Sequence, residues 1–232
     1  MNLSTYLPTL SPHQLQQLEH LADLFLDWNS KLNLSAIRDR EGVLLKHIVD
    51  SLLILPFHFI QPGQKVLDMG TGGGFPGLAL AIAYPEADFT LVDATEKKIK
   101  AVSSMAQSLG LKNVRCLSGR AEEMGQDRKY REQYDLVVAR ALAHFSTLLE
   151  YCLPFVKVGG HFIAYQGPEL IDEWKNYQNV AALLSARILQ CEEALLPLDE
   201  AKRCFIVVEK TKPLSSAYPR RVGVPKKTPL LA

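Results

Sequence analysis

The stretch that decides the fold is VLDMGTGGGFPG, residues Val66–Gly77. Here an apolar run reaches Asp68, glycines follow at positions 70, 72, 73, 74 and 77, and an apolar helical segment comes next. Glycine permits positive φ and lets a ligand approach the backbone, so a glycine-rich turn between a strand and a helix indicates a nucleotide-binding site. The match of Gly72, Gly74 and Gly77 to the GxGxxG dinucleotide pattern is weak, because any glycine-dense turn satisfies it.

Two acidic residues narrow the choice of ligand. Asp68 precedes the glycines, and a carboxylate there suits a cationic or amine-bearing ligand better than a pyrophosphate. The resulting Asp-x-Gly-x-Gly run resembles motif I of Rossmann-like S-adenosylmethionine-dependent methyltransferases. Asp93 ends the next expected strand, where an acid can bind the ribose hydroxyls of either NAD or S-adenosylmethionine. The chain has no GxxxxGK[ST] loop, which argues against an ATPase or a GTPase.

Short apolar strands alternate with helical segments from residue 65 onward. The expected strands are residues 65–69, 89–93, 114–117, 134–139 and 161–165, and the expected helices between them are residues 77–84, 96–109, 147–156 and 169–184. Such alternation, with strands that are apolar almost throughout, predicts a parallel sheet covered by helices on both faces. Two more strands, residues 188–192 and 203–209, have no helix between them and should form an antiparallel hairpin at one edge. The predicted fold class is therefore α/β, a Rossmann-like sheet of seven mostly parallel strands.

Two helices before the first strand form a predicted N-terminal cap. Ser11 can cap a helix over Ser11–Leu32, Pro12 suits its first turn, and apolar residues at steps of three and four give it one apolar stripe. A second helix is expected over residues 41–55, ended by Pro56. We therefore divide the chain into an N-terminal helical cap (residues 1–60), a methyltransferase domain (61–211) and a basic, proline-rich tail (212–232).

Composition and charge are those of a folded chain with a cationic end. The 232 residues are 47% hydrophobic and 22% charged, which excludes disorder over most of the length. The net charge of +1 is unevenly spread, because residues 211–232 contain lysines and arginines but no acid. A cationic tail on a near-neutral body suits a locally anionic partner, although a tail that only aids solubility fits the charge as well.

The sequence also indicates a cytoplasmic protein without a metal. Its longest apolar stretch, Ile48–Ile60, is interrupted by Asp50 and is shorter than the roughly 20 residues that span a bilayer. The N-terminus has neither a basic region nor a long apolar one, so no signal peptide is expected. The four cysteines show no CxxC spacing, so we expect no metal site and reduced thiols.

Several further stretches together resemble one known family. These are DMGTGGGFPGLALAI at residues 68–82, HIVDSL at His47–Leu52, WNSKLNLSAIRD at Trp28–Asp39 and YPRRVGVPKKTPL at Tyr218–Leu230, with the pair Arg140–Ala141 after the fourth strand. In these stretches the chain is similar to the RsmG family, also called GidB, the bacterial 16S ribosomal RNA guanine-N7 methyltransferases. The resemblance implies a class I methyltransferase fold, S-adenosyl-L-methionine as cofactor, and the 16S rRNA of the small ribosomal subunit as partner.

The resemblance also implies which residues bind. The implied cofactor contacts are Gly70, Gly72, Phe75, Asp93, Ala94, Thr95, Ala121, Glu122 and Arg140. In the tail, the candidates for RNA phosphate contacts are Arg220, Arg221, Lys226 and Lys227. Such contacts add affinity and salt dependence but no sequence choice. The chain departs from the family at Gln166, where many members carry lysine, so one positive charge is missing there.

The implied reaction needs little acid–base chemistry. Guanine N7 carries an in-plane lone pair and no proton, so it can attack the methyl group without a general base, and we assign no catalytic residue. The enzyme then contributes proximity and alignment, worth about 7–11 kcal/mol in favourable cases. The chain lacks the Asn/Asp-Pro-Pro-Tyr/Phe and Pro-Cys motifs of amine and cytosine-C5 methylation. His47 and Asp50 share one helix face, and they contact the substrate, brace the glycine loop, or form a buried polar pair that ties the cap to the sheet.

Other functions could use the same loop. A small-molecule S-adenosylmethionine-dependent methyltransferase would share the glycines but gives no reason for the cationic tail. A NAD-dependent oxidoreductase, or a catalytically silent nucleotide-binding module, would use the GxGxxG match and Asp93. Apart from the RNA, we expect no binding partner: the protein should be a monomer that binds neither a membrane nor a metal.

Overall fold

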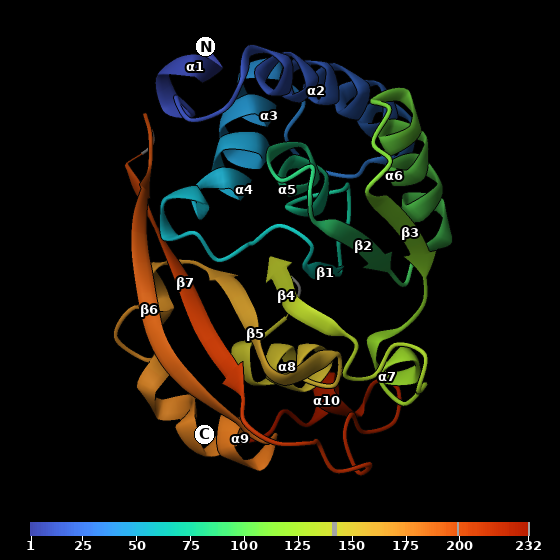
Figure 1. The fold of residues 1–232 in the computed structure, drawn as a ribbon, viewed down its shortest axis with the longest axis vertical. Helices are drawn as coiled ribbons and strands as arrows, with labels where there is room; N and C mark the ends of the chain where they lie inside the picture. The colour runs from blue at the N-terminus through green and yellow to red at the C-terminus, as the bar shows by residue number, and fades with distance from the viewer. Residues whose placement is uncertain (141–142, 199, 232) are drawn as a thin grey trace.

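The computed structural model describes residues 1–140, 143–198 and 200–231, and its centre is one seven-stranded sheet (Figure 1). The strands are β1 (Lys65–Met69), β2 (Asp88–Asp93), β3 (Val114–Ser118), β4 (Tyr134–Arg140), β5 (Val156–Gln166), β6 (Ala186–Leu196) and β7 (Ala201–Lys210). Their order across the sheet is β3-β2-β1-β4-β5-β7-β6. β1 to β5 run parallel, β7 is antiparallel to β5, and β6 is antiparallel to β7. The predicted mostly parallel sheet with an antiparallel hairpin at one edge is therefore confirmed.

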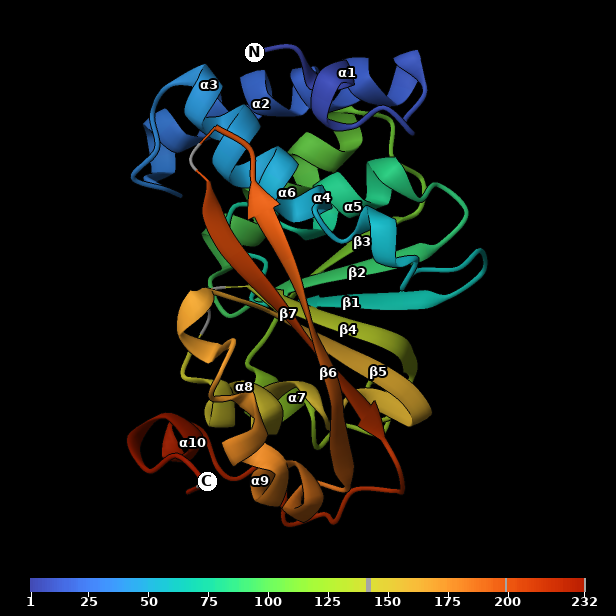
Figure 2. The ribbon, with the colours of Figure 1, turned by 90° about the vertical axis from the view of Figure 1, so that its left-hand side faces the viewer.

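Helices cover both faces of this sheet, which Figure 2 shows edge-on. One face carries α1 (Leu3–Tyr6), α2 (Pro12–Leu32), α3 (Arg40–Val43), α4 (Asp50–Leu52), α5 (Gly77–Ala83) and α6 (Glu96–Ser108), and the other carries α7 (Ala121–Met124), α8 (Phe145–Cys152), α9 (Gln178–Leu183) and α10 (Val224–Lys227). Along β4, Leu136 and Val138 belong to the first core, whereas Val137 and Ala139 belong to the second. No helix within the described ranges is long and apolar enough to cross a membrane.

The N-terminal cap is built on α2. Ser11 Oγ accepts the Gln14 N–H at 3.3 Å and Gln14 Oε1 accepts the Ser11 N–H at 3.0 Å, so the predicted start of this helix is a reciprocal capping box. The second predicted helix, residues 41–55, is instead α3, a π-helical turn at Leu44–Val49, and α4, which ends at Leu52. Residues of α2 and of this turn share one core with β1 and α5.

The segment predicted as one helix over residues 169–184 is broken. It contains 3-10 turns at Pro168–Leu170 and Trp174–Tyr177 before the short α9. Its apolar residues Ile171, Trp174 and Tyr177 recur at steps of three. That spacing matches the three residues per turn of a 3-10 helix better than the 3.6 of an α-helix.

β5 starts earlier than predicted, at Val156 instead of residue 161. The preceding helix, α8, is therefore shorter at its carboxyl end than the predicted residues 147–156. β5 includes Gly159 and Gly160, and its pairing with β4 is irregular there, because the register shifts between Tyr134 and Leu136.

The expectation of free, reduced thiols is wrong for two of the four cysteines. Cys191 Sγ and Cys204 Sγ are joined in a disulfide, with 6.0 Å between their Cα atoms. Cys191 stands opposite Ile206 and Cys204 opposite Glu193, so the two cysteines are diagonal neighbours on one face of the β6–β7 hairpin. The register between β6 and β7 brings the two cysteines together, and their spacing in the sequence does not reveal that register.

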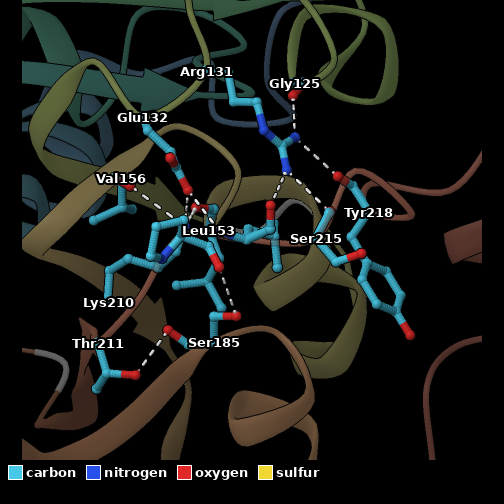
Figure 3. Close-up of polar contacts among 12 residues, drawn as sticks. Gly125, Arg131, Glu132, Leu153, Val156, Ser185, Lys210, Thr211, Ser215 and Tyr218 are labelled. Carbon is cyan, nitrogen blue, oxygen red and sulfur yellow. Dashed lines mark hydrogen bonds and ion pairs between the residues drawn. The ribbon is translucent and has the colours of Figure 1, made fainter.

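The tail is docked on the body through two cations, the half-buried Arg131 and the buried Lys210 (Figure 3). The Arg131 guanidinium donates to the carbonyls of Gly125, Leu214, Ser215 and Tyr218 at 2.6–3.0 Å. Lys210, which is fully buried, donates to the Leu153 carbonyl at 2.8 Å and lies 3.1 Å from a Glu132 carboxylate oxygen. That same oxygen accepts the Leu214 N–H at 2.8 Å, so both cations hold the chain where the tail begins.

The tail contains one short helix, α10, although it also contains Pro213, Pro219, Pro225 and Pro229, and prolines disfavour helix interiors. α10 lies beside α8 in both ribbon views (Figures 1 and 2). Pro225 stands in the first turn of α10, where its missing N–H has no helical partner to lose.

Candidate active site

The glycine loop follows β1 at the carboxyl ends of the parallel strands. The N–H groups of Gly70 and Thr71 donate to the Val92 carbonyl at 2.8 and 2.9 Å, which ties the loop to β2. Gly70 and Gly74 have φ angles of 75° and 100°, which residues with a side chain rarely adopt. The loop therefore presents its backbone at the sheet edge where open α/β folds bind ligands.

Asp68 braces this loop from inside. Its Oδ2 accepts the Thr71 hydroxyl at 2.6 Å and the Gly77 N–H at 2.8 Å. A Cβ on Gly77 would stand 2.6 Å from that oxygen and 2.7 Å from Leu91 Cγ, so only glycine lets α5 approach the strands this closely. Asp68 is completely buried, and burial raises the pKa of its carboxyl to about 6.

Asp93 holds the other side of the loop. Its Oδ2 accepts the Gly72 N–H at 3.1 Å, and its Oδ1 accepts the Thr95 N–H at 2.8 Å. The side chain is 9% exposed, and a carboxylate offers about four acceptor sites, so Asp93 keeps acceptor capacity toward a ligand.

Two adjoining hollows open beside the loop. The first, here named the β3-side hollow, measures about 200 Å³ and is lined by Ala94, Ala121 and Glu122, among others. The second, the β4-side hollow, measures about 270 Å³ and contains the end of β4. Gly70 and Asp93 line both, so the two hollows meet at the glycine loop.

Arg140 is the central side chain of the β4-side hollow. Its Nη1 donates to Asp50 Oδ2 at 2.8 Å, and its guanidinium carbon lies 5.9 Å from the centre of the Phe75 ring. Asp50 is nearly buried and also accepts from Arg203 Nε, so one carboxylate holds two arginines. The guanidinium of Arg140 is therefore held in one orientation. Its predicted neighbour in the family motif, Ala141, lies outside the described residues.

His47 joins the cap to the same hollow. Its ring stacks on Phe75 with the centroids 5.0 Å apart, and its Nε2 lies 2.9 Å from Ser35 Oγ. Burial and, second, the charge of Arg140 lower the pKa of His47 to about 4, so the ring is neutral at pH 7. Through Arg140, His47 and Asp50 tie the cap to the sheet, which is one of the three roles that the sequence left open, and His47 also lines the hollow.

Glu122 is held in the β3-side hollow from two sides. Its Oε1 accepts the Gly223 N–H of the tail at 2.9 Å. On the other side, burial and then the charge and hydrogen bond of Glu122 raise the pKa of Tyr151 to about 12. Glu122 is 7% exposed, so the tail and α8 together fix a carboxylate in the wall of this hollow.

Most residues expected to bind the cofactor meet here. Those that line one or both hollows are Gly70, Gly72, Phe75, Asp93, Ala94, Ala121, Glu122 and Arg140. Thr95 is not among the described lining residues, and it stands at the start of α6. Phe25, Lys98 and Tyr151 also line the hollows but were not predicted. For Phe25 the reason is that the apolar stripe of its helix marks burial and carries no sign of a ligand.

The cationic residues of the tail are of two kinds. The Arg220 side chain donates to both oxygens of Glu150 at 2.6–3.0 Å, and Glu150 is fully buried, so this arginine serves the fold. Arg221, Lys226 and Lys227 are exposed, and Lys226 also lines the β3-side hollow.

Hollows of larger volume lie elsewhere. One of about 590 Å³ lies between α2 and α5, and one of about 340 Å³ lies at the amino ends of β1 to β4. Neither includes a described residue of the glycine loop, Asp93 or Arg140. Volume alone therefore does not identify the site, whereas the meeting of a glycine loop with a strand-end acid at the carboxyl edge does.

The strand order, the glycine loop after β1 and the acid at the end of β2 define a Rossmann-like fold of the methyltransferase class. A methyltransferase solved with the Haloferax volcanii Trm112 activator matches 81% of this chain and 98% of its own, with a TM-score of 0.58 and 14% identity. TYW2 of M. jannaschii, solved with AdoMet, matches 75% of this chain and 79% of its own, with a TM-score of 0.55 and 14% identity. At such identities the likeness shows the fold alone.

Comparison of sequences is more specific. The family model described as rRNA small subunit methyltransferase G (GidB) matches residues 14–199. The ribosomal RNA small subunit methyltransferase G of Alkaliphilus metalliredigens is 42% identical over 221 residues, which cover 95% of this chain and 92% of that protein. The protein of the same name from an Exiguobacterium species is 42% identical over 223 residues, 96% of this chain and 93% of that protein. The chain belongs to the rRNA small subunit methyltransferase G family, as its motifs indicated.

Proposed function

We propose that this chain transfers a methyl group from S-adenosyl-L-methionine to N7 of one guanine in 16S ribosomal RNA. The observation that carries the proposal is the pair of hollows that meet at Gly70 and Asp93, in a chain of this family. A ribosomal substrate is consistent with a cytoplasmic protein, and we expect it to be a monomer that needs no metal.

The residues around the loop fit an adenosine-bearing donor. Asp93 has acceptor sites left after its bonds to Gly72 and Thr95, and ribose hydroxyls can use them. When bound, S-adenosylmethionine supplies a methyl group activated by its sulfonium centre. Arg140 lies in the adjoining hollow, where its fixed guanidinium can bind a carboxylate or orient a base.

The side chains beside Arg140 suit a reaction that removes no proton before methyl transfer. His47, with a pKa of about 4, is a weak base, and Asp50 is paired with two arginines. Guanine N7 already has its lone pair available in the ring plane. The chain's contribution is therefore to hold the base and the donor in line and to exclude water from them.

We further propose that Arg221, Lys226 and Lys227 face RNA phosphates, while Arg220 anchors the tail from which they project. The three side chains are exposed, whereas the donors of Arg220 are bonded to Glu150. Phosphate contacts of this kind set the position of the RNA and leave the choice of guanine to the site itself.

Labelled S-adenosylmethionine tests the activity directly. Incubation with 30S subunits from a strain that lacks the gene should label one guanine at N7, and subunits from the parent strain should accept no label. An Asp93→Ala variant, checked for folding by circular dichroism, should label far more slowly. If no ribosomal substrate is labelled by the wild type, the proposed function is wrong.

Calorimetry separates the other functions. S-adenosylhomocysteine should bind to the wild type and NAD should not. Tight binding of NAD without binding of S-adenosylhomocysteine would favour an oxidoreductase or a nucleotide-binding module. Binding of S-adenosylhomocysteine together with methylation that does not depend on the charge of the tail would favour a small-molecule methyltransferase.

A further inference from the structure

Side chains of the body hold the C-terminal segment against α7 and α8. Gln126 donates to the carbonyls of Ser216 and Pro219 at 3.0 and 2.9 Å. Thr147 Oγ1 donates to the Pro225 carbonyl at 3.0 Å. The Arg131 contacts of Figure 3 add bonds to the carbonyls of Ser215 and Tyr218. The segment is therefore held both before α10, at residues 215–219, and within α10, at Pro225.

The ion pair between Arg220 and Glu150 makes this docking hard to undo. Three hydrogen bonds join the guanidinium to both carboxylate oxygens, and the Arg220 N–H donates to Glu150 Oε1 at 2.8 Å. Glu150 is fully buried, so undocking would leave a charged group without a partner in the interior. The docked position is therefore the resident state of the segment.

The docked segment reaches the β3-side hollow at two points. Gly223 donates its N–H to Glu122 Oε1 at 2.9 Å, with a φ of 81° that suits glycine. Lys226 lines the hollow that Asp93 and Glu122 also line. Within the described ranges, the Lys226 ammonium forms no hydrogen bond or ion pair, so its donors are available to a ligand.

The chemistry of Lys226 fits the adenosine part of a donor. An ammonium group donates hydrogen bonds and accepts none. Adenosine offers acceptors in its ring nitrogens and ribose oxygens. The cation also lies in a hollow with two carboxylates, Asp93 and Glu122, so it offsets negative charge around a neutral base.

We infer that residues 218–228 form a wall of the donor pocket, in which Lys226 binds the adenosine part of the donor and Gly223 positions Glu122. The inference rests on the proposed function, because it takes the β3-side hollow as part of the donor site. It reassigns Lys226 from the RNA phosphates to the cofactor, whereas Arg221 and Lys227, which do not line the hollow, keep their proposed phosphate contacts.

Two neighbouring lysines of α10 provide the test of Lys226. Calorimetry with S-adenosylhomocysteine on the full chain compares Lys226→Met with Lys227→Met, since Lys227 is also exposed but does not line the hollow. We expect Lys226→Met to weaken binding by about tenfold or more, as for the loss of a hydrogen bond to a charged group. Lys227→Met should keep the wild-type affinity for S-adenosylhomocysteine. If Lys226→Met also keeps it and weakens only RNA binding, Lys226 belongs to the RNA contact and the inference about it is wrong.

Amide hydrogen exchange tests the wall itself. If the segment is part of the pocket, S-adenosylhomocysteine should slow exchange at Gly223 and its neighbours, because coupling between two sites is reciprocal. The β6 strand, at the far edge of the sheet, is the internal control. Unchanged exchange at Gly223 in a protein saturated with S-adenosylhomocysteine would contradict the inference that residues 218–228 form a wall of the donor pocket. A wild type that does not bind S-adenosylhomocysteine would instead overturn the proposed function.

Discussion

Asp93 has two tasks at the scale of a single residue, since its carboxylate both fastens the glycine loop and faces the hollows. Asp93→Ala removes both, and we expect the affinity for S-adenosylhomocysteine to fall at least about tenfold, or about 1.4 kcal/mol. Asp88→Ala, at the exposed amino end of the same strand, should leave the affinity unchanged. Calorimetry on both variants checks the result, and equal affinities would place the donor elsewhere.

Asp68 gives a prediction about pH and stability. Its carboxyl pKa is about 6 in the folded chain against an ordinary 3.8, so between these values the folded state binds a proton that the unfolded state lacks. This group therefore makes the folded state less stable as pH rises from about 4 to 6, and the loss persists above pH 6. Asp68→Asn removes the ionisation and should gain stability relative to the wild type over that range, by an amount on the order of 3 kcal/mol. Urea unfolding at several pH values measures the difference, and a difference that is constant with pH would contradict it.

Between elements, α2 packs tightly against the glycine loop at Gly73. A Cβ on Gly73 would stand 2.5 Å from Phe25 Cε2, and the Phe25 ring is buried. Gly73→Ala should therefore destabilise the fold by about 1–3 kcal/mol, as overpacking does. Adding Phe25→Leu, which shortens the side chain, should recover part of that loss. A double-mutant cycle by denaturant unfolding measures the coupling, and purely additive effects would show that the two elements do not press on each other.

The elements themselves were largely predictable from local pattern. β1 and α5 have their predicted places because a parallel strand covered on both faces is a short apolar run, and a glycine turn marks where it ends. The segment 169–184 was mispredicted because steps of three and of 3.6 differ little over so few residues. For the hairpin, two successive strands without a helix between them were predicted correctly, but the cysteine pair depends on their register.

The site was predictable only in part, for a physical reason. Gly70 and Asp93 lie at junctions that the strand pattern locates, so their meeting follows from the topology of the sheet. The partner of Arg220 is Glu150, 70 residues away, and no local pattern couples the two. Contributions from the cap, such as Phe25, depend in the same way on how distant elements pack.

For the whole molecule, the question is whether the affinity for RNA depends on the cations of the tail or on the total charge of the protein. Arg221→Gln with Lys227→Gln removes two exposed cations from the tail, and the plot of log affinity for 16S rRNA against log salt should then become shallower by about 1.5. Lys112→Gln with Arg115→Gln removes the same charge beside the hollow at the amino ends of the strands, opposite the donor site, and should leave that slope nearly unchanged. This design keeps Arg220 bonded to Glu150, whereas deleting the tail would unpair a buried carboxylate and confuse loss of binding with loss of fold. Filter binding at several salt concentrations measures both pairs. Equal slopes for the two would mean that the RNA senses net charge and not this segment.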